Sequence, residues 1–536
     1  MANINAERRI SYGSYFTMTP ARTLIPVLLL PLSVLMLISG FRATGQTASP
    51  VRLYVREVPL EVLGRKVRTV EIVQEDGTQG LYPQKSGGFN VEVVNQLKVP
   101  TSLHWHGLIL PALMDGVPFV SQEPIPPNGT MAYKFPLIQS GTYWMHSHYG
   151  LQEQLLNAAP LIIDDPEERG KADQQVVILL SDFSFKSPEQ ILSKLKGGME
   201  NMKGMEKPPG TPNKDGMPMK PMKQKLLSQQ WDESTQRFVA VAAMSELPDT
   251  DVKYDALLAN RRTLENPQVF RVKAGQTVLL RIIDGSAATN FFVSTGELAT
   301  ELTAVDGKDV SALHGNFFQL GTAQRIDLRT KIPDQDGVFP ILAQGEGTGQ
   351  RCGVILATEG KTIPKLSTQT KVVTAGLDNT QELRLVASHG LAEKPVDRTL
   401  QSILGGSMAS YDWTINGHAY PNRDSLDVRE GERVEILFRN DTNMAHPMHL
   451  HGHDFQVVEI DGKPVPGALR DTLLVPPRSA IKVRFDANNP GLWAFHCHIL
   501  YHLATGMFTV LKYEGANTEF WQPEKTLSEI PGLEAR

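Results

Sequence analysis

Cysteine is almost absent from this chain, and its scarcity limits how the fold can be held together. The 536 residues include two cysteines, Cys352 and Cys497. Two cysteines allow at most one disulfide, and none if either thiol has another task. The strand-like stretch RCGVILATEG (351–360) favours a buried, inert thiol for Cys352. The hydrophobic core must therefore hold the fold largely without covalent cross-links.

A surplus of basic charge is also lacking. The formal net charge is -5, with 41% hydrophobic and 21% charged residues, an ordinary composition for a globular protein. A mildly acidic chain is a poor partner for nucleic acid, so we expect no such partner. At about 150 residues per domain, the length predicts three or four domains.

The apolar run at the N-terminus is short for a membrane span. Residues 24–39, LIPVLLLPLSVLMLIS, would form a helix of about 24 Å, against about 30 Å of hydrocarbon. Arginines at 8, 9 and 22 precede this run, which is typical of a cleaved signal peptide. We assign residues 1–45 to a signal peptide, with an uncleaved N-terminal anchor as the alternative. The prediction is an exported protein, periplasmic or extracellular, whose mature form has no stable membrane span.

Helical periodicity is scarce, whereas short alternating runs broken by Gly, Pro, Asn and Asp are frequent, which predicts an all-β fold. Three runs repeat one pattern: SGGFNVEVVN (86–95), GQTVLLRIID (275–284) and GERVEILFRN (431–440). Their alternating apolar residues predict strands with one buried face, and each run ends in a turn residue. The corresponding positions are Phe89, Val278 and Val434; Val91, Leu280 and Ile436; Val93, Ile282 and Phe438; and the terminal Asn95, Asp284 and Asn440.

A second element repeats downstream of each run, as GTYWMHSH (141–148), GVFPILAQ (337–344) and GLWAFHCH (491–498). Histidines occupy its sixth and eighth places in the first and third copies, where the middle copy has Leu342 and Gln344. We therefore predict three similar β-domains, of which only the outer two carry the histidines. The approximate boundaries are 50–167, 168–370 and 371–525.

One stretch of the middle domain departs from this pattern. GGMENMKGMEKPPGTPNKDGMPMKPMK (197–223) is rich in Gly, Pro, Lys and Met, so it cannot bury a core and is interpreted as a mobile insertion. Thioethers suit Cu(I), and the alternative is a linker enriched in methionine by chance. The candidate Cu(I)-binding residues are Met199, Met202, Met205, Met217, Met219 and Met222.

Ten of the fourteen histidines fall into four clusters. A single His-x-His pair is weak evidence, because surface histidine pairs are common on strands, but four clusters at matching repeat positions are not explained in this way. Residues i and i+2 of a strand point to the same side, so HWH, HSH and HCH predict paired metal ligands. The clusters are His104 and His106; His146 and His148; His446, His449 and His451; and His496, His498 and His502.

The donor set indicates copper. Imidazole suits copper, zinc and iron, whereas thiolate with thioether favours copper. Zinc is the competing metal, but structural zinc sites close at four ligands, which ten histidines and a thiolate exceed. The remaining histidines follow no ligand spacing and are interpreted as structural: His314, His389, His418 and His453.

The stretch HCHILYHLATGM (496–507) predicts two metal sites that share one strand. His496 and His498 face one side of the strand and Cys497 faces the other. Two histidines, a thiolate and a weak axial thioether describe a blue-copper electron-transfer site. The flanking histidines then bind a copper cluster on the far face, one covalent residue away from the thiolate. The predicted blue-copper ligands are His446, Cys497, His502 and Met507.

These motifs resemble the signatures of the multicopper oxidases. HWHG (104–107), HSH (146–148), HPMHLHG (446–452) and HCHILYHLATGM (496–507) match them in order, over nearly all of residues 50–520. The resemblance implies three cupredoxin-like Greek-key β-sandwich domains and about four coppers per chain, with a trinuclear site between domains one and three. It implies a type 2 copper on His104 and His449, and a type 1 copper on His446, Cys497, His502 and Met507. A type 3 pair falls on His106, His146, His148, His451, His496 and His498.

Within this family, LHWHGLILPALMDGVP (103–118), GTYWMHSHYGLQEQ (141–154) and the methionine-rich insertion look most like the bacterial copper-resistance oxidases, with laccase-like signatures. Such proteins are exported and protect cells against copper, in some cases by oxidising Cu(I). Asp115 matches a family acid near the type 2 copper that assists proton delivery, and the alternative is a turn-capping residue before Gly116. Another family acid is replaced by Tyr501, which puts a second proton route in doubt.

The resemblance implies an oxidase that couples four one-electron oxidations at the type 1 copper to reduction of O2 to water, with Cys497 and Asp115 as catalytic residues. Cu(I) is the expected substrate, and oxidation of phenols, aromatic amines or Mn(II) is the alternative. A non-catalytic exported copper-binding protein would be expected to have lost ligands, and a copper nitrite reductase would lack the type 3 ligands. We expect a monomer.

Overall fold

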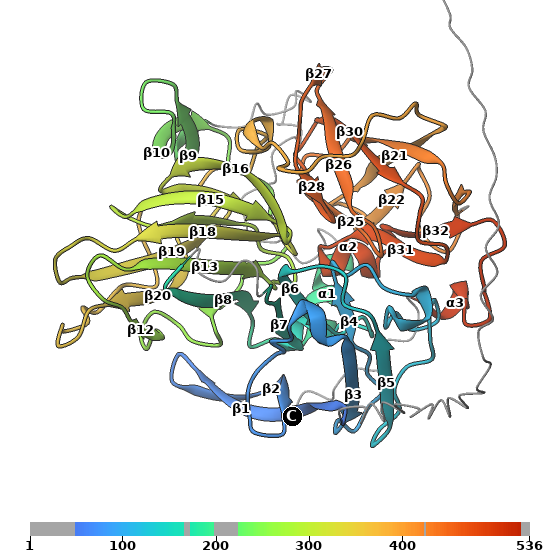
Figure 1. Cartoon of the computed structure of the whole chain (residues 1–536), viewed down its shortest axis with the longest axis horizontal. Coiled ribbons are helices and arrows are strands. Elements are labelled where there is room, and N and C mark those ends of the chain that lie inside the picture. The colour runs from blue at the N-terminus through green and yellow to red at the C-terminus, as the bar shows by residue number, and fades with distance from the viewer. Residues whose placement is uncertain (1–48, 166–171, 198–222, 423–424, 527–536) are drawn as a thin grey trace, which may run out of the picture. The chain divides into compact units, whose positions relative to one another are not determined.

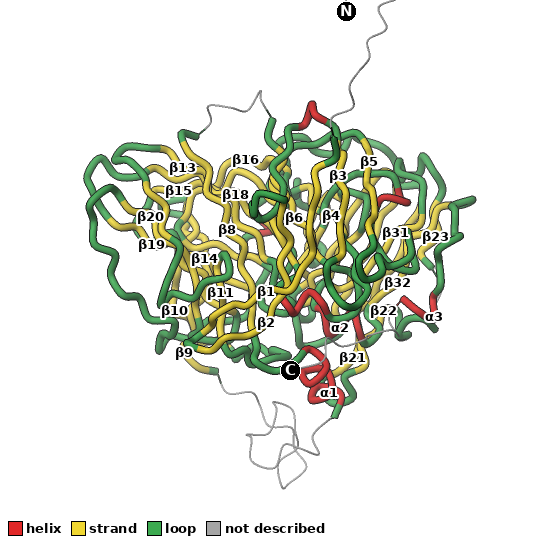
Figure 2. Tube along the Cα trace, turned by 90° about the horizontal axis from the view of Figure 1, so that it is seen from below, coloured by secondary structure: helices red, strands yellow, loops and turns green. Residues whose placement is uncertain are grey.

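The structure is a computed structural model that describes residues 49–165, 172–197, 223–422 and 425–526. Strands dominate these residues and the helices are short (Figure 2), so the predicted all-β class is confirmed. No helix within the described ranges is long and apolar enough to cross a membrane. The segment 1–45 and the six methionines of the insertion lie outside the described residues, so their roles stay predictions.

The described strands form six sheets, two in each of three successive stretches of chain, which we call the first, middle and third sheet pairs (Figure 1). The first pair joins a four-stranded sheet, β2-β1-β3-β5, to a three-stranded sheet, β4-β6-β7. Its strands are β1 (Val51–Val62), β2 (Arg65–Gln74), β3 (Phe89–Asn95), β4 (His104–His106), β5 (Thr130–Phe135), β6 (Gly141–His146) and β7 (Ala158–Ile163).

The middle pair has an eight-stranded sheet, β11-β8-β13-β18-β15-β16-β10-β9, and a five-stranded sheet, β12-β20-β19-β14-β17. Its strands are β8 (Gln174–Phe183), β9 (Gln224–Asp232), β10 (Arg237–Ser245), β11 (Ala256–Ala259), β12 (Val269–Arg271), β13 (Thr277–Asp284), β14 (Phe291–Ser294), β15 (Ala299–Val305), β16 (Lys308–Gly315), β17 (Phe317–Leu320), β18 (Arg325–Lys331), β19 (Val338–Gly345) and β20 (Arg351–Ala357).

The third pair has a seven-stranded sheet, β22-β21-β24-β30-β26-β27 with β28 on β26, and a five-stranded sheet, β23-β32-β31-β25-β29. Its strands are β21 (Arg398–Ser407), β22 (Asp412–Ile415), β23 (Leu426–Val428), β24 (Arg433–Asn440), β25 (His446–Leu450), β26 (Phe455–Ile460), β27 (Lys463–Pro464), β28 (Leu469–Arg470), β29 (Thr472–Val475), β30 (Ala480–Asp486), β31 (Leu492–Cys497) and β32 (Phe508–Tyr513).

The helices are short connections between strands. The helix α1 (Pro188–Lys196) begins with a capping box, in which Ser187 accepts from the Gln190 N–H and the Gln190 side chain accepts from the Ser187 N–H. The helix α2 (Leu500–Ala504) follows β31 and buries Tyr501 and His502. The others are α3 (Pro523–Thr526), η1 (Lys85–Gly87), η2 (Ala112–Met114), η3 (Gln152–Leu155) and η6 (Glu382–Arg384).

The first predicted repeat is confirmed as β3, β13 and β24, which have the same neighbours in their sheets. Each lies parallel to the first strand of its own pair (β1, β8 or β21) and antiparallel to β5, β18 or β30. All nine predicted apolar positions are at most 4% exposed. The alternation seen in the sequence therefore marks the buried face of one equivalent strand in each sheet pair.

The second repeat is formed by β6, β19 and β31, which pair antiparallel with β4, β14 and β25. His104 lies opposite His146, and His449 opposite His496. One hydrophobic core contains residues of both the first and third sheet pairs, whereas a separate cluster fills most of the middle pair. The four histidine-bearing strands are thus brought together where the outer pairs meet.

The turn residue that ends each repeat is also used in the same way in the outer pairs. The Asn440 amide donates to the carbonyls of Met444, Val475 and Pro476 at 2.7, 2.9 and 3.0 Å, and its oxygen accepts from the Thr442 N–H. Asn95 makes the equivalent set of four bonds in the first pair. Both asparagines are at most 1% exposed, so each is a buried junction between a strand end and the next turn.

We expect Asn440→Ala to lower the free energy of unfolding by about 3 kcal/mol, because three buried carbonyls lose their donor at about 1 kcal/mol each. Calorimetry of the apo-protein measures this change. Asn488→Ala, at an exposed position, is the control and should shift the free energy by less than about 0.5 kcal/mol. Equal stability of the two variants would contradict the structural role given to Asn440.

Candidate metal centre

Eight histidines from the first and third sheet pairs converge in one place, and all are buried except His148, which is half-buried. They come from β4, β6, β25, β31 and the residues that follow β6, β25 and β31, and these four strands lie together in Figure 1. Three ring pairs have centroids 3.8 to 5.0 Å apart across the two sheet pairs: His106 and His449, His104 and His451, and His148 and His496. The other two members are His146 and His498, with centroids 4.9 Å apart.

One ring nitrogen of each of these histidines is free to bind a cation. The Nε2 atom of His496 lies 3.2 Å from that of His148 and 3.0 Å from that of His451. In the other five histidines, a buried nitrogen makes no hydrogen bond within the described part of the chain: Nδ1 of His106 and Nε2 of His104, His146, His449 and His498. Buried polar atoms are seldom left without a partner, so this convergence fits bound metal.

Burial also favours the uncharged form of most of these rings, which is the form that binds metal. It lowers the pKa of His106, His146 and His449 well below the usual value, and the neighbouring histidines lower it further. The pKa of His496 is lowered to about 4, again by burial first. Neutral imidazoles that cannot pair with one another bind a soft or borderline cation such as copper.

Asp115 holds two members of the cluster from one side. Its backbone carbonyl accepts from His104 Nδ1 at 2.8 Å, and its carboxylate lies 2.9 Å from His451 Nδ1. The residue is fully buried at the end of η2, and its N–H donates to the Ala112 carbonyl. Asp115 therefore has both the turn position and the proximity to the ligands that the sequence suggested, and its part in proton delivery stays a prediction.

Asp471 holds two further members and was not identified from the sequence. Its backbone carbonyl accepts from His449 Nδ1 at 2.8 Å, and its Oδ1 atom lies 3.1 Å from His106 Nε2. The Thr472 hydroxyl lies 3.0 Å from the same His106 nitrogen. A lone acid between β28 and β29 has no spacing signature, so the sequence offers no signal for it.

Glu153 is a second acid without a sequence signal, although it follows the HSH motif closely. Its carboxylate lies 3.3 Å from His146 Nδ1 and 3.7 Å from His498 Nδ1. Burial and the acidic neighbour Asp182 raise its pKa well above the usual value. Tyr501, where the family acid is missing, donates to the adjacent Gln154 side chain at 2.9 Å. A buried acid is therefore present near the cluster, but it comes from η3 and not from α2.

The predicted blue-copper residues lie together on the opposite face of β31. The Cys497 sulfur is 3.7 Å from Nδ1 of His446 and 3.7 Å from Nδ1 of His502, and these two nitrogens are 3.1 Å apart. Met507 is fully buried beside them, and its carbonyl accepts from the Cys497 N–H. Burial raises the pKa of the Cys497 thiol, so its ionisation needs the charge of a bound cation.

The outer nitrogens of the two imidazoles beside Cys497 are also occupied. His446 Nε2 lies 2.8 Å from the Thr442 hydroxyl, and His502 Nε2 lies 3.1 Å from the Asp251 carboxylate. Tyr411 donates to the same carboxylate at 2.8 Å. Asp251 comes from the middle sheet pair, between β10 and β11, and the sequence analysis did not single it out.

The histidines interpreted as structural lie outside both groups. His453 is buried, but its two nitrogens lie 2.9 Å from the His451 carbonyl and 2.6 Å from the Tyr513 hydroxyl, so neither is free. His314 is more than half exposed, near Glu301 on the surface of the middle pair. His389 and His418 are exposed.

Comparison with known proteins identifies the family. Three models described as multicopper oxidase match residues 82–168, 174–359 and 393–516, which together make up most of the chain. The multicopper oxidase MmcO of Mycobacterium tuberculosis is 33% identical over 426 residues, 79% of each chain. The chain belongs to the multicopper oxidase family. Copper is therefore its cofactor, as the donor set indicates.

Other similar proteins are copper-resistance proteins and solved oxidase structures. Copper resistance protein A of Escherichia coli is 27% identical over 533 residues, covering 79% of this oxidase and 86% of that protein. The crystal structure of Fet3p, a multicopper oxidase that functions in iron import, covers 89% of the oxidase with a TM-score of 0.68 at 20% identity. A laccase from Botrytis aclada covers 86%, with a TM-score of 0.63 at 20% identity. These structures show the cupredoxin-like fold.

We expect Cys497→Ser to remove the blue colour and the substrate oxidation of the copper-loaded oxidase, because a hydroxyl is a poor ligand for this copper. Bound copper should fall from about four to about three per chain, as the ligand sets imply. Visible absorption and metal analysis measure both effects. Cys352→Ser removes the other buried thiol, in the middle sheet pair, and should stay blue. A Cys497→Ser protein that remains blue would contradict the assignment.

Proposed function

We propose that the oxidase takes electrons from Cu(I) at a type 1 copper bound by Cys497 and uses them to reduce O2 to water at three further coppers bound by the eight converging histidines. Cys497 and its two neighbours along the chain connect the sites covalently. The observation that carries the choice of substrate is the buried Asp251 carboxylate on the outer nitrogen of His502. The names of the copper-resistance relatives point the same way.

The ligand set of this proposal is the one that the sequence predicted. Its support is that one ring nitrogen of each cluster histidine faces other ligand nitrogens or no partner at all. The proposed ligands are His104 and His449 for type 2; His106, His146, His148, His451, His496 and His498 for type 3; and His446, Cys497, His502 and Met507 for type 1.

Enclosure of the type 1 site supports a small substrate. His446, His502 and Tyr411 are fully buried, and Trp413 packs over the His502 ring at a centroid distance of 4.0 Å. A phenol ring cannot touch an imidazole that is covered in this way. An electron can instead enter through Asp251, which hydrogen-bonds to His502 and belongs to the segment between β10 and β11.

The negative charge of the segment between β10 and β11 supports a cationic substrate. Glu246, which is exposed, and the half-buried Asp249 lie close in sequence to Asp251, and burial together with the Asp251 charge raises the pKa of Asp249. Carboxylates attract a metal ion and offer nothing specific to a neutral phenol. The same features would suit Mn(II), whereas laccase-like oxidation of bulky phenols or aromatic amines is less compatible with this enclosure.

The sequence of the methionine-rich insertion, residues 197–223, also supports Cu(I) as the substrate. Its thioethers suit Cu(I), and a tether raises the local concentration of ion near the type 1 site. Export to the periplasm or the cell exterior, the signal peptide at 1–45 and a monomeric state belong to the same proposal. A non-catalytic copper carrier is disfavoured, because none of the twelve proposed ligands is missing from the sequence.

Asp251→Asn tests the entry route. We expect the rate of Cu(I) oxidation at low substrate concentration to fall about tenfold, because loss of the carboxylate charge weakens both cation binding and the hydrogen bond to His502. Oxidation of a phenol and the blue spectrum should change much less. Asp255→Asn is the matched control, since Asp255 lies four residues away and bonds to Ser184 and Phe185 instead. Equal losses of Cu(I) and phenol oxidation would argue against a cation substrate.

Deletion of residues 197–223 tests the contribution of the insertion. We expect slower Cu(I) oxidation at low substrate concentration, unchanged or faster phenol oxidation and an unchanged blue spectrum, because the segment cannot contribute to a core. Assays with Cu(I), a phenol and Mn(II) under O2 measure the three activities. A Cu(I) rate that is unaltered by the deletion would reduce the insertion to a linker.

A further inference from the structure

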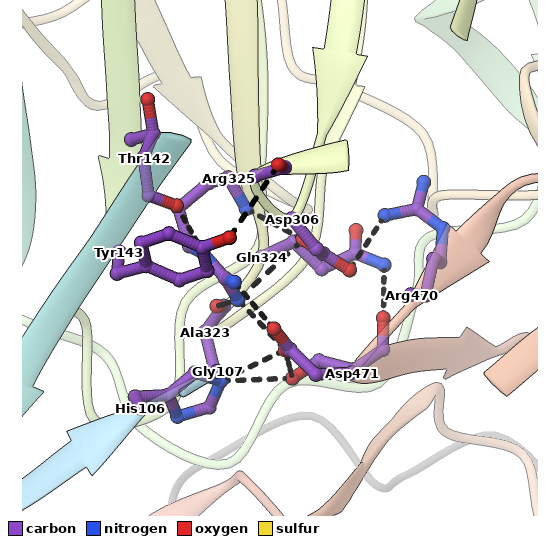
Figure 3. Close-up of polar contacts among 12 residues, drawn as sticks. His106, Gly107, Thr142, Tyr143, Asp306, Ala323, Gln324, Arg325, Arg470 and Asp471 are labelled. Atoms are coloured by element: carbon purple, nitrogen blue, oxygen red, sulfur yellow. Dashed lines mark hydrogen bonds and ion pairs between the residues drawn. The ribbon is translucent and has the colours of Figure 1, made fainter. Parts of the chain in front are cut away.

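The middle sheet pair holds no proposed copper ligand, yet one of its arginines reaches the histidine cluster. Arg325 begins β18 and is fully buried. Its two terminal nitrogens pair with the two carboxylate oxygens of Asp471, one of them at 2.7 Å (Figure 3). This fork-to-fork contact fixes the plane of the carboxylate as well as its charge.

The same carboxylate determines which nitrogen of His106 is free. Asp471 Oδ1 lies 3.1 Å from His106 Nε2, and an ionised carboxylate can only accept hydrogen bonds. The proton of His106 is therefore held on Nε2, which leaves Nδ1 as the nitrogen with no partner among the described residues. In each of the other histidines of the cluster Nε2 faces another ligand nitrogen or has no partner among the described residues, so His106 is the one member whose free nitrogen is Nδ1 alone.

Arg325 is held rigidly by its other contacts. Its Nε donates to the Thr142 carbonyl at 3.1 Å and its Nη1 to the Ala323 carbonyl at 3.2 Å. Its backbone N–H donates to Asp306 at 2.9 Å, and the Asp306 carboxylate also lies 3.6 Å from the guanidinium. The guanidinium therefore has partners on several sides: Thr142 lies in the first sheet pair, and Ala323 lies in the turn before β18.

The network continues into the third sheet pair and closes there. Arg470 donates to Asp306 at 3.0 Å (Figure 3). It also donates to Glu382 at 2.9 Å. Arg470 precedes Asp471 in the chain, so the two ends of the network are joined by a peptide bond. Charges alternate along this chain, and each buried ion has a counter-ion, which is the condition for burying them at all.

The backbone of the HWHG motif leaves room for the pair. Gly107 has φ +87°, and a Cβ atom placed on it would lie 2.5 Å from both the Arg325 guanidinium and the Asp471 carboxylate. The glycine that follows His106 is thus required by the ion pair that orients His106. The positions of His106, Gly107 and the Arg325–Asp471 ion pair therefore depend on one another.

We propose that Arg325 is a positioning residue for the trinuclear site: through Asp471 it holds His106 in the tautomer that presents Nδ1 to copper. The proposal rests on the ligand set proposed above and is independent of the substrate. The middle sheet pair thereby acts on the cluster without contributing a ligand.

Arg325→Met tests this role in the copper-loaded oxidase. We expect weaker binding at the type 3 pair by at least about tenfold, as is usual when a partner of a metal ligand is lost. The type 3 absorption band and the bound copper should fall, while the blue absorption stays, because its proposed ligands all lie in the third sheet pair. Arg325→Lys keeps the charge but cannot bridge both oxygens, so it should recover only part of the band.

Arg281→Met is the matched control. Arg281 is also a buried arginine of the middle pair, bonded to Thr142 at 2.9 Å and to Asp327 at 3.0 Å, and none of its hydrogen-bond or ion-pair partners is a proposed ligand. We expect a full type 3 band in this variant. An equal loss in Arg281→Met and Arg325→Met would reduce Arg325 to a domain contact and overturn the proposal, as would a full band in Arg325→Met.

Two further measurements keep the outcome unambiguous. Loss of the blue absorption in Arg325→Met would mean that this variant has not folded. In that case Arg325→Lys tests the proposal instead, and a full type 3 band in Arg325→Lys would overturn it. The unmodified protein tests the ligand set itself by copper analysis and electron paramagnetic resonance. If the unmodified protein lacks the type 3 band, the proposed ligand set is wrong. If the band is present in the unmodified protein and is lost on substitution of Arg325, the positioning role is supported.

Discussion

The structure depends on one constraint: eight neutral imidazoles must converge in a buried space, each with a chosen nitrogen turned inward. Burial favours the uncharged ring, as the lowered pKa values of His106 and His449 indicate, but burial does not select the nitrogen. The selection comes from acceptors on the outer side. Asp115 and Asp471 each face two histidines with a carboxylate or carbonyl oxygen, and Glu153 lies beside two more. An acceptor holds the proton on the nearer nitrogen and frees the other one for metal.

These acids are kept in the protein interior by different means. Asp471 is paired with Arg325, so its negative charge is neutralised by a fixed cation. Glu153 has acidic neighbours in Asp182 and Asp284, and burial together with them raises its pKa well above the usual range, which favours the uncharged carboxyl. Both are recognised ways of burying an acid. Charged groups are therefore distributed unevenly around the histidine cluster. The ion pair of Arg325 and Asp471 lies on the side that faces the middle sheet pair.

Local rules were enough to predict the strands and the histidines but not the residues that orient them. Alternation over a strand places His496 and His498 on one face and Cys497 on the other, because successive side chains point to opposite sides. Equivalent alternation in β3, β13 and β24 exposed the repeat. Asp471 lies 365 residues from His106 in the chain, and Glu153 and Asp251 lie in connecting segments without a ligand-like spacing. A single acid has no period and no spacing, so its role follows only from the packing of one sheet pair on another.

The middle sheet pair has no histidines at the repeat positions, yet it contributes residues near both groups of histidines. At the sixth place of the second repeat, the first pair sets His146 against His104 and the third sets His496 against His449, whereas the middle pair sets Leu342 against Ser294, so it can pack but not bind copper. It supplies Asp251 to the residues around Cys497 and Arg325 to the residues around His106. Both are charged groups that act on a ligand through one hydrogen bond or one carboxylate. On the proposed ligand set, the middle pair can change such contacts without altering the donor set, so the proposed substrate entry through Asp251 and the proposed positioning by Arg325 can be adjusted separately on one scaffold.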